Sequence, residues 1–275
     1  MIDTRPFFRP LAVELTTLLR RLPPHAWDLP TSAAPWTVRD ILAHLVDGMM
    51  RRLSFDRDRL PPPAPRRPIA GERDFVAFIN ELNREWVEVA RRLSPRLLTD
   101  LHASVSLDLA AFFEQAPLDA PARFSVSWAG EAESEAWFDI GREFTEQWHH
   151  QAQIRDAVGA PAPPNPEWLR AVLQIAMRGL PHAYRDIEAA NGDTLAVEVT
   201  GVSGGAWTLQ RDDRRWTLGE GAPARTPAAR AVMSDDTAWR LLFNGLAATD
   251  AAQRLELTGA AALTAPLLRA RSVIV

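Results

Sequence analysis

The sequence contains no cysteine among its 275 residues. This absence excludes disulfide bonds, metal sites built from cysteine ligands and a cysteine nucleophile. Any thiol chemistry carried out by this protein would therefore need a thiol that comes from outside the chain.

Lysine is also absent, so all 31 basic residues are arginine. The net charge of −4 and the pI of about 5.9 give no electrostatic argument for nucleic-acid binding. Arginine has one possible functional role in this sequence, the binding of carboxylates, because its planar guanidinium binds them through paired hydrogen bonds. Small acidic substrates need such cationic partners, and only arginine can supply a permanent one here.

Long hydrophobic runs are missing as well. No apolar stretch approaches the roughly 18 residues of a transmembrane helix, and residues 1–6 lack the apolar segment of a signal peptide. A hydrophobic content of 47% with 24% charged residues is typical of globular proteins. We therefore expect a cytoplasmic protein that contacts neither membrane nor nucleic acid.

Residues 133–158 form a long run without proline, which predicts a helix ended by Gly159. Glu146 and His150 lie four positions apart in this run, so a carboxylate and an imidazole project from the same face. His149 lies about 100° round the helix and is predicted to pack or to face solvent, not to share a ligand with His150.

A third candidate ligand, His44, lies on the helix predicted to begin after Thr37, with Asp40 completing a capping box. Alone, His44 is more simply a core histidine hydrogen-bonded to a neighbour. Together with Glu146 and His150 it supplies two imidazoles and one carboxylate. This set suits Zn²⁺ with open positions for water or substrate, and non-haem iron uses the same residue types.

The remaining pattern predicts helices in the first part of the chain and a mixture of strands and helices after Pro181. We expect an α domain at residues 1–160, a linker and connecting helix at 161–180, and an α+β domain at 181–275. Helices are predicted at 11–22, 37–49, 72–93, 133–158, 168–178, 235–243 and 260–269, with 96–114 ambiguous; strands are predicted at 194–201, 206–211, 215–218, 229–233 and 254–258.

Two stretches resemble the metal motifs of DinB-like, mycothiol-dependent maleylpyruvate isomerases. They are residues 36–45 (WTVRDILAHL) and residues 146–150 (EQWHH) with 154–159 (IRDAVG). The resemblance implies an N-terminal DinB-like four-helix bundle that holds a divalent metal, usually zinc, through His44, Glu146 and His150. It also implies a small α+β sterol-carrier-protein-like domain after about residue 181.

The same resemblance implies an enzyme that uses mycothiol or a similar thiol, as an isomerase or an S-transferase. One position departs from the pattern: family members carry Gly-Arg where this chain has Gly245-Leu246. Arg240 is then the candidate catalytic arginine, in an active cavity expected between the two domains, with a small molecule, in particular a carboxylate, as substrate. The alternatives are a metal-dependent hydrolase on the same scaffold and a non-catalytic metal-binding or ligand-carrier protein.

Overall fold

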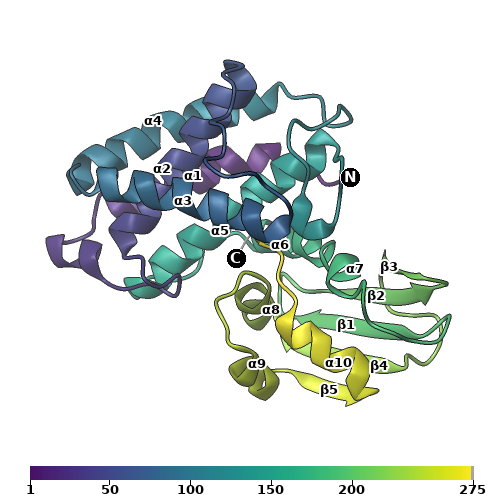
Figure 1. Cartoon of the computed structure of the whole chain (residues 1–275). Coiled ribbons are helices and arrows are strands. Elements are labelled where there is room, and N and C mark those ends of the chain that lie inside the picture. Colours follow the sequence, from purple (N-terminus) through teal and green to yellow (C-terminus); the bar gives the residue numbers. More distant parts are fainter. Residues whose placement is uncertain (274–275) are drawn as a thin grey trace. The chain divides into compact units, whose positions relative to one another are not determined.

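The computed structural model describes residues 1–273 of the chain, and its elements follow one another as labelled in Figure 1. The residues cluster into two compact units. The helical unit comprises Asp3–Arg123 and Glu146–Pro164, and the sheet unit comprises Met1–Ile2, Phe124–Thr145 and residues 165–273. Helix α5 (Ala136–Ala157) contributes its first part to the sheet unit and its second part to the helical unit.

The helical unit is built from long amphipathic helices, α1 (Arg5–Leu19), α2 (Val38–Arg52), α3 (Glu72–Ala90) and α4 (Pro95–Glu114), with the second part of α5. Helix α4 packs against α1 and α2, and α2 packs against α3. Their apolar faces meet in a core because the helices present hydrophobic side chains every three to four residues. This core includes Phe8, Leu11, Leu15, Ile41, Leu42, Met49, Leu98, Phe113 and Trp148.

Two of these helices differ from the sequence-based expectation. Helix α1 begins at Arg5, six residues before the predicted start; Pro6 lies in its first turn, where a missing N–H breaks no hydrogen bond, and Pro10 lies inside the helix. The ambiguous segment 96–114 is one continuous helix, α4. Its start is fixed by Ser94, whose side chain accepts a hydrogen bond from the backbone N–H of Leu97.

The sheet unit contains one five-stranded sheet in the order β3-β2-β1-β4-β5. Neighbouring strands are antiparallel except for β1 and β4, which pair in parallel. In β1, Leu195, Val197 and Val199 are buried, as the alternation in the sequence predicted. Ala196, predicted to face outward, is buried as well. The strands are β1 (Thr194–Thr200), β2 (Gly205–Asp212), β3 (Arg215–Glu220), β4 (Ala229–Ser234) and β5 (Glu256–Gly259).

Short helices accompany the sheet, and the sequence pattern missed two of them, α7 and α9. Both are too short to show a helical period. The predicted helix at 260–269 is an α-helical turn that continues as a 3₁₀ helix. The helices are α6 (Pro166–Met177), α7 (Leu180–Ala183), α8 (Asp235–Leu242), α9 (Ala248–Arg254), α10 (Ala261–Thr264) and the 3₁₀ helix η4 (Ala265–Arg269).

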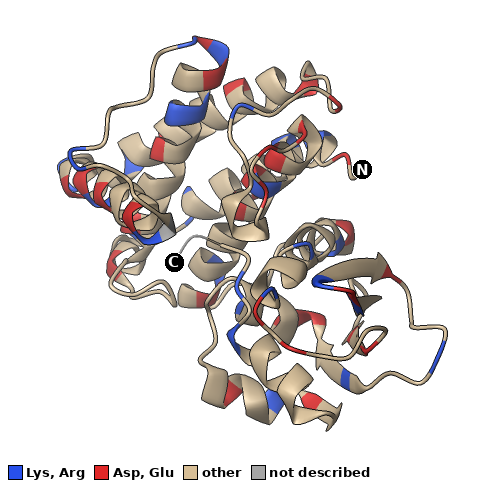
Figure 2. Ribbon diagram, turned by 45° about the vertical axis from the view of Figure 1, so that its right-hand side comes forward, with Lys and Arg blue, Asp and Glu red and all other residues tan. Residues whose placement is uncertain are grey.

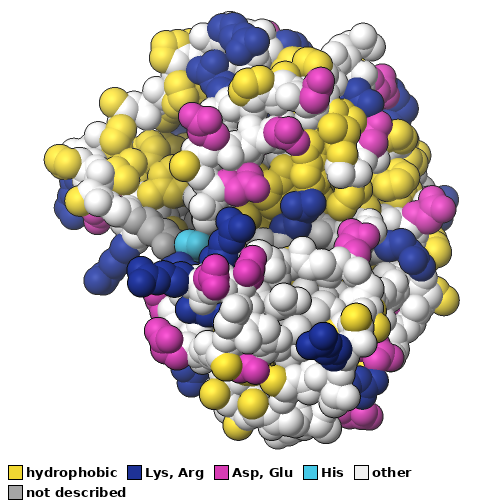
Figure 3. Space-filling model, turned by 90° about the vertical axis from the view of Figure 1, so that its right-hand side faces the viewer, with side chains coloured by type: hydrophobic (Ala, Val, Ile, Leu, Met, Phe, Trp, Pro, Cys, Tyr) yellow, Lys and Arg dark blue, Asp and Glu magenta, His cyan; other side chains and the backbone are white. Residues whose placement is uncertain are grey.

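The chain thus combines a helical unit with a unit of mixed helices and sheet, as the sequence predicted. Basic and acidic residues are interspersed along both units (Figure 2), and their side chains are interspersed over the face seen in Figure 3. Within residues 1–273, none of the helices is both long and apolar enough to cross a membrane.

Candidate metal centre

The second part of α5 places Glu146 and His150 one helical turn apart on the same face, as their spacing predicted. The Nε2 atom of His150 lies 3.3 Å from the Oε2 atom of Glu146. The end of this helix is anchored by Arg155, which donates hydrogen bonds to Glu14 of α1 and to the backbone oxygen of Pro161. Gly159, with φ of +66°, then ends the helix in the left-handed conformation that glycine adopts without strain.

Helix α2 positions His44 through the predicted capping box. Thr37 and Asp40 exchange side-chain and backbone hydrogen bonds, which satisfies N–H groups of the first turn. The carboxylate of Asp40 also binds the guanidinium of Arg91, the residue that follows α3, at 3.0 Å. One turn further along, the Nε2 atom of His44 lies 3.9 Å from the same Oε2 atom of Glu146. The capping box at the start of α2 and the ion pair between Asp40 and Arg91 therefore hold α2 so that His44 faces α5.

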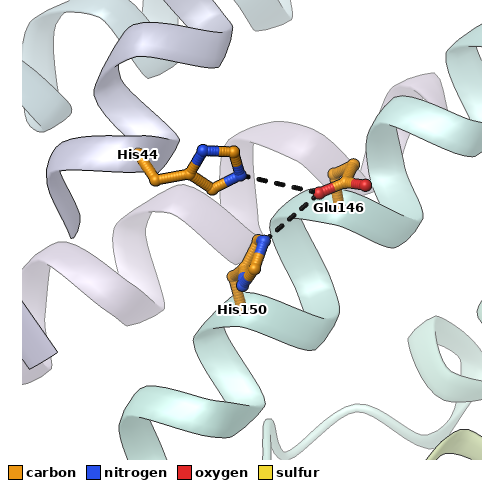
Figure 4. A group of neighbouring side chains, drawn as sticks. All are labelled: His44, Glu146 and His150. Carbon is orange, nitrogen blue, oxygen red and sulfur yellow. Dashed lines mark ion pairs between the residues drawn. The ribbon is translucent and has the colours of Figure 1, made fainter. Parts of the chain in front are cut away.

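The three predicted ligands converge on one point (Figure 4). His44, Glu146 and His150 each offer one ligand atom, and these atoms lie within 4.8 Å of one another. Two ligands bound tetrahedrally to zinc, each at about 2.1 Å, stand about 3.4 Å apart. The observed separations of 3.3 and 3.9 Å match that spacing closely enough for small side-chain rotations to close the site.

Hydrogen bonding orients His150 for metal binding. Its Nδ1 atom lies 2.8 Å from the amide oxygen Oε1 of Gln153, and both side chains are buried. An amide oxygen only accepts hydrogen bonds, so Nδ1 carries a proton and a neutral imidazole has its lone pair on Nε2. That lone pair faces the carboxylate of Glu146. Two electron-rich atoms at this distance need a cation between them, either a proton or a metal, so the donor set fits a divalent ion.

The ionisation states of His44 and Glu146 also favour the binding of a divalent metal. Burial lowers the pKa of His44 to about 4; the carboxylate of Glu146 opposes this shift in part, and the positive charge of Arg51 adds to it. Burial raises the pKa of Glu146, but hydrogen bonds with His150 and His44 outweigh it, so that this pKa lies well below its usual range. A neutral imidazole and an ionised carboxylate are the forms that bind a metal.

Two neighbours of the site were not anticipated from the sequence. The ring of Trp36, which is half-buried, has its centroid 4.9 Å from that of His44 and 6.5 Å from that of His150. The other is Gln153. Its spacing of three residues from His150 on a helix is the feature of the sequence that could have identified it as a partner. His149 is buried, with its ring 4.0 Å from that of His150, and it is not one of the three converging residues.

Arg240 lies in the sheet unit, on α8, whereas the three candidate ligands lie in the helical unit. Its guanidinium forms an ion pair with Asp236 at 2.9 Å and lies 4.4 Å from the ring centre of Trp239. Leu246, which the resemblance sets where family members are expected to carry arginine, is buried. A catalytic role for Arg240 stays a prediction.

Comparison with known proteins gives two findings. The family model described as the mycothiol maleylpyruvate isomerase N-terminal domain matches residues 8–155. Among solved structures, mycothiol-dependent maleylpyruvate isomerase is similar at a TM-score of 0.54 and 14% sequence identity, over 94% of this chain and 96% of that chain. A histidine-to-alanine variant of that enzyme matches with the same score and coverage at 13% identity. At such identities the likeness concerns the fold. The comparison with curated proteins found no match.

Proposed function

We propose that this chain, which belongs to the mycothiol maleylpyruvate isomerase family by a match over more than half of its length, is a metal-dependent enzyme that uses a small thiol. The metal is a divalent ion, zinc in the first place, and the thiol is mycothiol or a similar molecule. The reaction is an isomerisation or an S-transfer. The observation that carries the proposal is the convergence of His44, Glu146 and His150.

The fold supports the same assignment. The long helices α1, α2, α4 and α5 correspond to a DinB-like four-helix bundle, in which metal ligands project inward from facing helices. The mixed sheet with its short helices corresponds to a sterol-carrier-like domain. The structural likeness spans both parts of the chain, since it covers 94% of it.

The chemistry follows from what the chain supplies and what it lacks. A divalent metal, when bound, would lower the pKa of a coordinated thiol and favour the nucleophilic thiolate. The two imidazoles and one carboxylate leave a position open for that sulfur, whereas a structural zinc site has four protein ligands. The ring of Trp36 lies beside the imidazoles, nearer to His44 than to His150. With no cysteine in the chain, the thiol has to be a separate molecule.

The proposal is tested by metal analysis of the purified protein, followed by turnover with and without the thiol. Maleylpyruvate and related unsaturated carboxylates are the first substrates to try. We expect about one zinc per chain and turnover that requires both metal and thiol. Thiol-independent turnover would identify a metal-dependent hydrolase, and a protein that binds zinc without any turnover would favour a carrier. Absence of metal binding would refute the proposal.

A further inference from the structure

Helix α2 carries a second polar group on the face that holds His44. At 100° per residue, His44, Asp47, Gly48 and Arg51 fall within one arc of about 100°. Arg51 stands two turns beyond His44, and helical side chains lean toward the N-terminus, so its guanidinium extends back toward the metal site. The charge of Arg51 is close enough to oppose the protonation of His44.

The guanidinium of Arg51 is held in place by two buried acceptors. Its Nε atom forms an ion pair with Asp47 at 3.1 Å, and its Nη2 atom donates a hydrogen bond to Oδ1 of Asn83 on α3 at 2.7 Å. The remaining nitrogen, Nη1, makes no hydrogen bond to any residue between 1 and 273. The side chain is 23% exposed, so a small molecule can reach that nitrogen.

Gly48 lies between these two groups, four residues after His44 and three before Arg51. Glycine inside a helix costs about 1 kcal/mol relative to alanine, and it is usually explained by close packing. Here the described part of the chain places no atom within 4 Å of the position that a Cβ would occupy, beyond the helix itself and the neighbouring residues. Packing therefore does not require this glycine, and the missing side chain leaves open space between His44 and Arg51.

We propose that the surface of α2 over Gly48 is the subsite for an anionic substrate, with one carboxylate bound by Nη1 of Arg51 and the reacting part directed toward His44. This inference rests on the proposed function and deepens it, since it names the residues of α2 that would hold the carboxylate of the substrate. A guanidinium already fixed by Asp47 and Asn83 loses little conformational entropy on binding a carboxylate. It therefore binds the carboxylate more tightly than a freely moving arginine would.

The test measures the binding of maleate to the purified protein by calorimetry, with its uncharged dimethyl ester as the comparison ligand. We expect Arg51→Gln to weaken maleate binding about ten- to a hundredfold, the usual value of a hydrogen bond to a charged group, and to leave ester binding unchanged. Gly48→Leu should also block maleate, although it favours the helix. Gly48→Ala should weaken maleate binding less than Gly48→Leu. Both glycine variants should keep the zinc affinity of the wild type.

Two further variants keep the outcome clear. Arg51→Gln leaves the buried carboxylate of Asp47 without its partner, so the double variant Asp47→Asn with Arg51→Gln provides a neutral pair that folds without that penalty. Arg57→Gln is the matched control, because Arg57 is also paired with a neighbouring aspartate, Asp58, and its removal changes the net charge equally. It should bind maleate normally.

The outcomes separate this subsite from the proposed function. Unchanged maleate binding in Arg51→Gln and Gly48→Leu, or no maleate binding by the wild-type protein at millimolar concentration, overturns the subsite while zinc content and thiol-dependent turnover stand. A wild-type protein that binds no zinc refutes the proposed function. Maleate binding by such a zinc-free protein still tests whether Arg51 binds the carboxylate, because Arg51 is not a metal ligand.

Discussion

Replacing Gln153 by leucine tests how the structure prepares His150 for a metal. The side chains have similar volumes, but leucine cannot accept the hydrogen bond that now holds Nδ1 of His150 at 2.8 Å. The proton on Nδ1, and with it the lone pair on Nε2, would no longer be fixed. Partners of this kind contribute about ten- to a hundredfold to metal affinity, which corresponds to about 1.4–2.7 kcal/mol. Because both residues are buried, we expect the larger value.

The assay is competition for zinc between the protein and a chromophoric chelator of known affinity, at constant pH. Gln153→Glu is the matched variant, because its carboxylate accepts the same hydrogen bond and should retain zinc binding. The Nδ1–H group left unsatisfied in Gln153→Leu also lowers stability by about 1–3 kcal/mol, with or without metal, so thermal unfolding of both metal-free variants is measured alongside. A folded Gln153→Leu protein with the zinc affinity of the wild type would refute the reasoning.

The other predictions concern ligation and pH. His44→Ala and His150→Ala should each abolish stoichiometric zinc binding, whereas His149→Ala should retain it; equal zinc loss from His149→Ala, measured by elemental analysis, would contradict the assignment. Burial lowers the pKa of His102 to about 4 from 6.5, so the unfolded chain takes up this proton first and acidification favours unfolding. Between pH 6.5 and 4 the free energy of unfolding of the metal-free wild type should fall by on the order of 3 kcal/mol more than that of His102→Gln. Denaturant unfolding at the two pH values that gives the same loss for both proteins would exclude this. Arg240→Ala should raise KM for a carboxylate substrate and leave metal content intact, and wild-type kinetics in that variant would remove Arg240 from the candidates.

The patterns in the sequence did not predict some features of the fold. The start of α1 was missed because the apolar spacing was followed only from Leu11, whereas the helix begins at Arg5 and contains both Pro6, in its tolerant first turn, and Pro10. The short helices α7 and α9 have too few residues for a period to be seen. The division of the chain at residues 160 and 181 stays a prediction.

The sequence by itself determined the local part of the candidate site. The four-residue spacing of Glu146 and His150 requires them to share a helix face, and the capping box of Thr37 and Asp40 fixes where the helix carrying His44 begins. Alternation along β1 likewise placed Leu195, Val197 and Val199 in the core. These features depend on residues within one or two turns of each other, where backbone geometry alone sets the relation.

Only the tertiary structure decided which distant residues meet. About a hundred positions separate His44 from Glu146, and their approach depends on the packing of α2 and α5 within the helical unit. The same holds for Trp36 against the two imidazoles and for Asn83 of α3 against Arg51. The period of a helix shows which side chains share a face, but the partner of that face is selected by the fit of side chains between helices.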